Sequence, residues 1–234
     1  MQKASLILLN ILLIGQISFA QQSDEQPSWS MKQEIAPLAL ITIGSILLLS
    51  NIDSLVQKNI YKTTTDLDDY TQWAPIGIMY ALDAFKVPAK NSVQTQTAYF
   101  GIATISNAIL VHGLKNITHR TRPSNAKHSF PSGHTSQAFV SATVFWHEFK
   151  DTNPILASSA YVFATATGIM RMVNNKHWFT DVVVGAGVGI LVTDLLYAWD
   201  PLKNWDGFKF ENSSLKPSIG QMGEATVASL KFQF

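Results

Sequence analysis

Six stretches of this 234-residue chain contain no Asp, Glu, Lys or Arg, and this distribution of charge constrains the fold more than any other feature. Each stretch is rich in Ala, Leu, Ile, Val, Phe, Gly, Ser and Thr. Their lengths and composition predict helices, so the sequence predicts an all-α bundle of about six helices. The stretches cover residues 35–52, 70–82, 91–114, 128–147, 152–170 and 182–193.

Boundary residues support this helical interpretation at two places. Asn153 followed by Pro154 is typical of an N-cap with proline at the first helical position. Thr180 can cap the last helix, with Asp181 in a first turn where the helix dipole favours negative charge. We expect the helical domain to occupy residues 35–200.

The two ends of the chain differ from the helical part. Residues 1–20 have the pattern of an export signal, because Lys3 supplies a positive start, an apolar run follows, and small residues precede the cleavage position. Residues 21–34 form a polar N-terminal segment. The tail, residues 201–234, contains glycine turns and ends in alternating apolar and polar residues, which predicts a short β-hairpin.

Composition excludes several functions. The net charge is +1 and no run of basic residues occurs, so nucleic acid is not an expected partner. The chain contains no cysteine, which excludes disulfides, thiol catalysis and cysteine-ligated zinc. Any chemistry therefore depends on the few polar residues that interrupt the apolar background.

The sequence leaves open whether the helices cross a membrane. A span needs roughly 20 mostly apolar residues. Residues 91–114, 152–170 and 182–199 approach this requirement, but they contain polar residues such as Asn107 and Asp194. They are either modest membrane spans or buried core helices.

Three short clusters of polar residues stand out. The first contains Lys115 and Arg122, which are seven residues apart and would share one face of a helix that Pro123 ends. Lysine offers a point charge and arginine a planar fork, and both suit phosphate oxygens. Taken alone, this cluster is more typical of a solvated basic helix end.

The second cluster is Pro131-Ser132-Gly133-His134, which would lead into an apolar helix. Gly133 permits a turn that brings backbone N–H groups close to an anion, and the helix N-terminus favours that anion. Ser132 adds a hydroxyl donor, and His134 can hold a proton near neutral pH. The alternative is an N-capping serine beside an unrelated histidine.

Arg171, His177 and Asp181 form the third cluster. Four residues separate His177 from Asp181, so on a turn of helix the carboxylate can accept from one imidazole nitrogen and leave the other free. Such an arrangement activates a histidine as a nucleophile. Arg171 adds a third cation. A core histidine and a helix cap are the alternatives for the last two residues.

In order, spacing and residue types, the clusters resemble the three motifs of the type 2 phosphatidic acid phosphatase (PAP2) superfamily. This superfamily includes bacterial lipid phosphatases, bacterial acid phosphatases and vanadium haloperoxidases. Its motifs K-x6-R-P, P-S-G-H and S-R-x5-H-x3-D correspond to residues 115–123, 131–134 and 170–181. The resemblance covers residues 70–200. Met170 stands where the family has serine, which removes one phosphate hydrogen bond.

The resemblance implies a metal-independent phosphatase that works through a phosphohistidine. His177 would attack phosphorus, Asp181 would orient it, and His134 would protonate the leaving oxygen and then activate water. No metal or other cofactor is expected, and vanadate is expected to bind as a phosphate mimic. The residues expected to hold the phosphate oxygens are Lys115, Arg122, Ser132, Gly133 and Arg171.

The other histidines have weaker claims. His119 could border the site and His128 could flank its mouth, although a role outside the site is favoured for both. His112 and His147 are expected in the core or at an interface. A zinc site is disfavoured because the surrounding cations would repel a metal, and its ligands would be His128, His134, His177 and Asp181.

Together these inferences favour a periplasm-facing enzyme that acts on a lipid phosphate. Candidate substrates are phosphatidic acid, phosphatidylglycerol phosphate, a polyprenyl pyrophosphate and the lipid A phosphates. The alternatives are a soluble periplasmic acid phosphatase, a vanadate-dependent haloperoxidase and a non-catalytic lipid- or anion-binding membrane protein. We expect export and association with the inner membrane. A cleaved signal followed by six spans would place the first two motifs in the cytoplasm, so the number of spans stays open.

Overall fold

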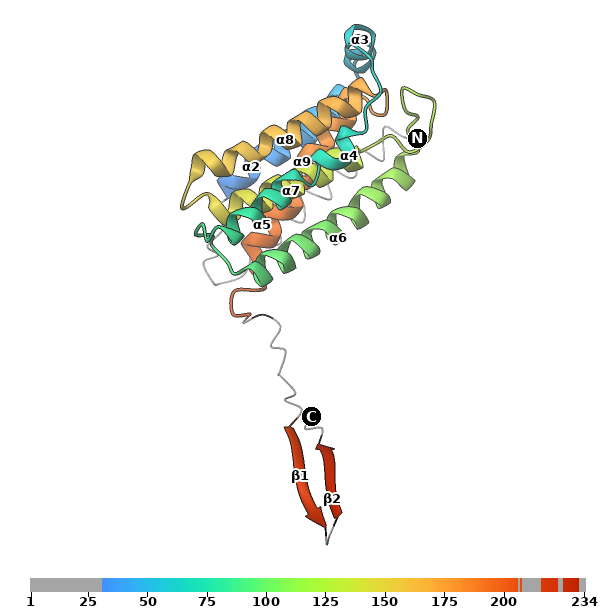
Figure 1. The fold of residues 1–234 in the computed structure, drawn as a ribbon. Helices are drawn as coiled ribbons and strands as arrows, with labels where there is room; N and C mark the ends of the chain where they lie inside the picture. The colour runs from blue at the N-terminus through green and yellow to red at the C-terminus, as the bar shows by residue number, and fades with distance from the viewer. Residues whose placement is uncertain (1–30, 206, 208–215, 223–224, 232–234) are drawn as a thin grey trace. The chain divides into compact units, whose positions relative to one another are not determined.

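The computed structural model describes residues 31–205, 207, 216–222 and 225–231. The predicted export signal and most of the polar segment after it lie outside these residues. The helices of the described part are shown in Figure 1: α2 (Met31–Leu47), α3 (Ile52–Asn59), α4 (Leu67–Thr71), α5 (Ala74–Ala84), α6 (Val93–Thr118), α7 (Gly133–Phe149), α8 (Pro154–Val173) and α9 (Phe179–Trp199).

The all-helical bundle is confirmed, but the expected count of about six helices is too low, because the described residues hold eight. The six apolar stretches correspond to α2, to α4 with α5, and to α6, α7, α8 and α9. A search for uncharged runs misses the short helix α3, which carries Asp53, and does not separate α4, which carries Asp68, from α5. Both carboxylates are buried and paired with arginines in the folded protein.

One of the two predicted helix starts is confirmed and the other is wrong. The side chain of Asn153 accepts from the Leu156 N–H at the start of α8. The N-cap of α9 is Trp178 instead of Thr180, because the Asp181 carboxylate accepts from the Trp178 N–H at 2.9 Å. The Thr180 N–H is used elsewhere and donates to Asp53 at 2.9 Å.

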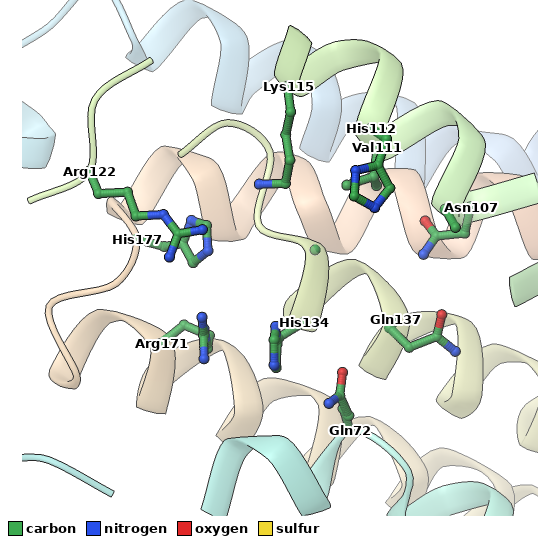
Figure 2. A pocket seen from close by; sticks show the side chains of 12 residues that line it. Gln72, Asn107, Val111, His112, Lys115, Arg122, His134, Gln137, Arg171 and His177 are labelled. Atoms are coloured by element: carbon green, nitrogen blue, oxygen red, sulfur yellow. The ribbon is translucent and has the colours of Figure 1, made fainter. Parts of the chain in front are cut away.

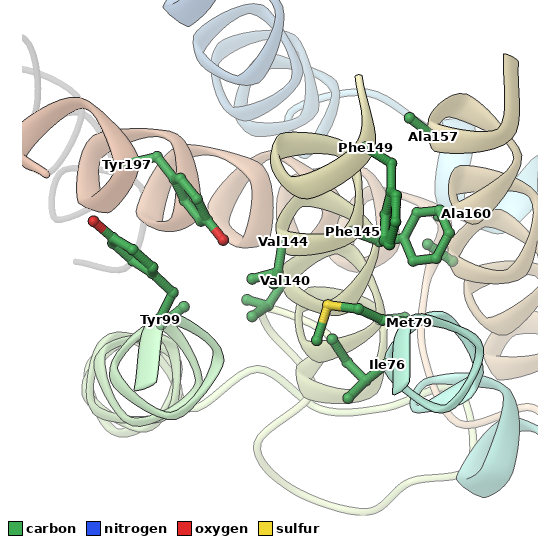
Figure 3. Close-up of a cluster of buried hydrophobic side chains, with 14 of the residues drawn as sticks. Ile76, Met79, Tyr99, Val140, Val144, Phe145, Phe149, Ala157, Ala160 and Tyr197 are labelled. Carbon is green, nitrogen blue, oxygen red and sulfur yellow. The ribbon is translucent and has the colours of Figure 1, made fainter. Parts of the chain in front are cut away.

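Helix α7 lies at the centre of the bundle and packs against α5, α6, α8 and α9, while α2 packs against α9. Apolar side chains from five helices meet around α7, as Figure 3 shows for Met79 of α5, Phe145 of α7 and Tyr197 of α9. Burial of these side chains stabilises the bundle and leaves the ends of its helices for polar residues.

Glycines of α9 allow it to approach α7 closely. A Cβ atom at Gly185 would lie 2.7 Å from the backbone oxygen of Ser132, and one at Gly189 would lie 2.2 Å from that of Ser136. Neither distance can accommodate a methyl group. The two glycines therefore bring the second polar cluster, at the start of α7, against the third cluster at the start of α9.

Among the described residues, three helices, α6, α8 and α9, are long and apolar enough to cross a membrane. Helices α2 and α3 would contribute a fourth span only as one segment bent by 91°. Helix α5 is apolar but has 11 residues, which corresponds to about 16 Å.

The chain divides after Asn204 into two compact units. In the second unit, strands β1 (Lys216–Met222) and β2 (Ala225–Lys231) pair antiparallel, with Lys216 opposite Lys231 and Met222 opposite Ala225. Residues 223 and 224 between the strands lie outside the described residues, so the β-hairpin expected for the tail stays a prediction.

Candidate active site

The three polar clusters meet at one end of the helical unit, where α6 and α8 end and α7 and α9 begin. A cavity of about 320 Å³ lies at this end (Figure 2). Six of the eight site residues expected from the sequence line it: Lys115, Arg122, Gly133, His134, Arg171 and His177. Asp181 and Ser132 lie beneath this lining and are fully buried. The remaining lining residues are Gln72, Asn107, Ala108, Val111, His112 and Gln137.

His177 and Asp181 form a buried pair at the base of the cavity. Nδ1 of His177 lies 3.6 Å from Asp181 Oδ2, just beyond hydrogen-bond distance, and it has no other partner among the described residues. Burial lowers the pKa of His177 to about 4, although the Asp181 carboxylate acts in the opposite direction. The imidazole is therefore neutral near pH 7, as a nucleophile requires.

Arg120 holds the Asp181 carboxylate, a contact that the sequence did not reveal. Its Nη1 donates to Asp181 Oδ1 at 2.5 Å, and its Nη2 donates to Asp53 Oδ2 at 2.6 Å. The guanidinium also lies over the ring of Trp178, 5.7 Å from its centroid. Asp181 Oδ2 accepts from the Ser129 hydroxyl as well. Arg120 thus links α3, the loop after α6 and the start of α9.

Arg122 reaches the cavity from a loop, which corrects the expectation that it shares a helix face with Lys115. Helix α6 ends at Thr118, because His119 adopts a left-handed conformation with φ of 47°. A turn in which the Arg122 N–H donates to Ala126 O at 2.7 Å then sets the loop. The guanidinium of Arg122 forms no ion pair or hydrogen bond within residues 31–205.

The other two cations are anchored to the protein. Lys115 Nζ donates to the backbone oxygens of His128 at 2.8 Å and Pro131 at 2.7 Å. Arg171 donates through Nη1 to Asp68 of α4. The Nε atoms of Arg122 and Arg171 are buried and have no partner in the described part of the chain. Burial lowers the pKa of Arg122, and the neighbouring Arg171 charge adds to the effect.

His134 begins α7 and is paired with a second residue that sequence reasoning missed. Its Nε2 lies 2.8 Å from Asp69 Oδ1 of α4. Burial and the charge of Arg171 lower the pKa of His134, while Asp69 and Asp68 raise it. Asp68 and Asp69 follow one another in the short helix α4, and only the tertiary structure brings them to the cavity.

Ser132 occupies a structural position in the described fold. Its hydroxyl caps α7, in contact with the Thr135 N–H and 2.8 Å from Thr135 Oγ1, and its N–H donates to the backbone oxygen of Asp181 at 3.0 Å. Gly133 lines the cavity, with its amide at the start of α7.

The positions of the remaining histidines differ in part from those expected from the sequence. His112 is exposed and lines the cavity, so it does not lie in the core; its place at an interface stays a prediction. His119 and His128 pack ring against ring, 5.4 Å apart, outside the lining. Within the described residues, the potential metal ligands that converge are Asp68, Asp69 and His134, of which Asp68 is already held by Arg171 and Asn174.

Comparison with known proteins identifies the family. The model of the PAP2 superfamily matches residues 96–205, which include all three polar clusters. A lipid A 1-phosphatase of Porphyromonas gingivalis is 32% identical over 171 residues, which cover 68% of this chain and 37% of that protein. The chain thus spans little more than a third of the length of this relative. The chain belongs to the PAP2 superfamily.

Two solved structures are also similar. The crystal structure of Aquifex aeolicus LpxE has 21% identity, with a TM-score of 0.47 over 62% of this chain and 92% of that one. A transmembrane PAP2-type phosphatidylglycerolphosphate phosphatase from Bacillus subtilis has 20% identity, with a TM-score of 0.41 over 85% of this chain and 96% of that one.

Proposed function

We propose that this protein is a metal-independent phosphatase that removes phosphate from a lipid through a phosphohistidine intermediate. One observation carries the proposal: three cations and two histidines line a single cavity, and the buried Nε atoms of Arg122 and Arg171 have no partner among the described residues. Buried N–H groups without partners are costly. A phosphate in the cavity would satisfy them and balance the cations.

The chemistry follows from the positions of the two histidines. With Nδ1 directed toward Asp181, the Nε2 of His177 is the nitrogen left to attack phosphorus, and Asp181 stabilises the positive charge that the ring then carries. His134 donates a proton to the leaving oxygen, and later takes one from the water that hydrolyses the phosphohistidine. Lys115, Arg122 and Arg171 neutralise the charge on the three equatorial oxygens.

Two observations support a lipid as the substrate. The relative from P. gingivalis is named for its action on lipid A. In addition, large apolar side chains on the outer faces of the spanning-length helices are exposed, with Ile105 and Ile109 of α6 at 63% and 70% and Val162 of α8 at 68%. Such faces suit contact with hydrocarbon chains, either of a bilayer or of a substrate held in it.

We further propose that the active end faces outward. Helix α2 runs toward this end, since Asp53 of the following α3 bonds to Thr180. If a cleaved signal left Gln21 outside and α2 crossed the membrane, the active end would face inward. An outward site therefore requires a retained signal or an α2 that does not cross the membrane, and the 91° bend between α2 and α3 supports the second arrangement.

Because the chain has no cysteine, single cysteines report the orientation. We expect a membrane-impermeant maleimide to label Ser124→Cys, in the exposed loop at the active end, in intact cells. Asp151→Cys, in the exposed loop at the opposite end, should react only after the cells are opened if the bundle spans the membrane. The reverse pattern would contradict an outward site, and labelling of both would contradict a spanning bundle.

The activity is tested by phosphate release from lipid phosphates in mixed micelles and from water-soluble phosphate esters. We expect release from lipids to exceed release from soluble esters, to be inhibited by vanadate, to persist in chelator, and to disappear in His177→Ala. His119→Ala, an exposed histidine outside the cavity lining, is the control and should remain active. Activity retained in His177→Ala would refute the nucleophile, and equal turnover of soluble esters would favour a soluble acid phosphatase.

A further inference from the structure

The cavity has two chemically different sides. Figure 2 shows Lys115, Arg122, Arg171 and His177 on one side, and the amide side chains of Asn107, Gln137 and Gln72 on the other, with His134 between them. The three amides come from α6, α7 and the turn between α4 and α5. They are 2%, 8% and 8% exposed.

Each amide uses one end on the protein and leaves the other for the cavity. Gln72 donates through Nε2 to Asp69 O at 3.1 Å, and Gln137 donates through Nε2 to Thr104 Oγ1 at 3.0 Å. Both keep a carbonyl oxygen without a hydrogen bond in the described residues. Asn107 accepts from the Ser136 hydroxyl through Oδ1, which leaves its Nδ2 donor. The three amides thus offer the cavity two acceptors and one donor.

This polarity is unusual for its surroundings. Asn107 lies eight residues before Lys115 on α6, about 12 Å from it along the axis and within a helix apolar enough to cross a membrane. When a substrate fills the cavity, these polar groups need a hydrogen-bonding partner, either water or a polar part of the substrate. An acyl or polyprenyl chain cannot provide that partner, because it carries no hydrogen-bonding group.

The order of the residues shows which part of a substrate would meet the amides. In an in-line displacement, the leaving oxygen departs on the side of phosphorus opposite to the nucleophile. His177 lies on the cationic side and His134, the proton donor, lies between that side and the amides. The leaving alcohol must then extend past His134 toward Gln72 and Gln137.

From this placement we infer that Gln72, Asn107 and Gln137 form a leaving-group subsite for an alcohol that carries hydroxyl or N–H groups next to the phosphoester, as an acylated amino sugar does. The inference rests on the proposed function. It favours glycolipid phosphates over phosphatidic acid, whose neighbouring ester groups only accept hydrogen bonds, and over polyprenyl pyrophosphates. Ala108 and Val111, the apolar lining residues of α6, would lie beside the attached chains.

The test compares an N- and O-acylated hexosamine 1-phosphate with phosphatidic acid of the same chain length, in the same micelles. We expect the wild type to prefer the glycolipid. Gln137→Met and Gln72→Met should each lower kcat/KM for the glycolipid about tenfold, as the loss of one hydrogen bond implies, and change it less than threefold for phosphatidic acid. Gln96→Met is the matched control, because Gln96 is a buried glutamine of α6 outside the cavity lining.

Equal losses on both substrates, no loss on either, or a wild-type preference for phosphatidic acid would overturn the subsite. Binding of the glycolipid phosphate to His177→Ala protein, measured with and without Gln137→Met, gives a readout that does not depend on turnover. If no phosphate ester is cleaved in a His177-dependent way, the proposed function fails. If cleavage depends on His177 but the amide variants do not discriminate, only the subsite fails.

Discussion

Replacing Arg120 should destabilise the protein strongly, although this residue lines no part of the cavity. The substitution Arg120→Met keeps most of the side-chain volume and removes the guanidinium. Asp181, which is fully buried, then loses its salt bridge, and Asp53, which is 7% exposed, loses the same partner. Two buried carboxylates would remain without a cation between them.

The magnitude follows from the burial of the network. Removal of one partner from a buried ion pair costs about 3–5 kcal/mol. The side chain of Arg120 is itself 23% exposed, so water screens part of the interaction and the lower end of this range applies. We therefore expect a loss of about 3 kcal/mol in the free energy of unfolding, together with a lower kcat because Asp181 is no longer held beneath His177.

Urea unfolding in mild detergent, followed by the fluorescence of the six tryptophans, measures the change. Arg122→Met is the matched control, since Arg122 lies two residues away and forms no salt bridge within residues 31–205. Its removal relieves repulsion among the cavity cations, so stability should stay within about 1 kcal/mol of wild type while phosphate release is lost. Equal stability losses in the two variants, or a loss below 1 kcal/mol in Arg120→Met, would refute this account of the network.

Three further predictions concern pH and packing. His177 must be neutral, and burial lowers its pKa to about 4, so kcat/KM should fall as the pH drops through about 4. His134 must be protonated, and burial lowers its pKa from the ordinary 6.5, so kcat/KM should also fall when the pH rises through a value below 6.5. Asp69→Asn removes a contact that raises the pKa of His134 and leaves Asp68 and Arg171 in place, so the fall of kcat/KM at high pH should move to lower pH. If this fall does not move, His134 is not the group that causes it. Gly189→Ala should lower the free energy of unfolding by about 3 kcal/mol, because the added methyl group pushes α9 from α7. Gly77→Ala, on the exposed face of α5 with open space around it, should be neutral or slightly stabilising. Thermal unfolding measures both.

The helical class and the polar clusters were predictable from the sequence because both depend on local order along the chain. Runs without charge predict helices, and Asn153 with Pro154 marks a helix start through contacts within one turn. The spacing of Lys115, Arg122, His134 and His177 likewise carries the family pattern without reference to the fold.

The partners of those residues were decided only by the tertiary structure. Arg120 meets Asp53 and Asp181 across 67 and 61 residues of sequence, and Asp69 meets His134 across 65. No local pattern selects which carboxylate will reach a given cation over such separations, because the choice depends on how α3 and α4 pack against the bundle. The left-handed turn at His119, which moves Arg122 from a helix face to a loop, was likewise decided only by the tertiary structure.

The amide side of the cavity shows most clearly the difference between what the sequence predicts and what the fold decides. Gln72, Asn107 and Gln137 are ordinary residues in their own segments, and nothing in their spacing distinguishes them from other buried amides. They become a candidate subsite because three helical segments converge beside His134. By itself the sequence determined a helical chain that carries the three motifs of its family. The fold decided which charges hold Asp181 beneath His177 and which polar groups line the cavity beside His134, because only packing sets distances between segments far apart in the chain.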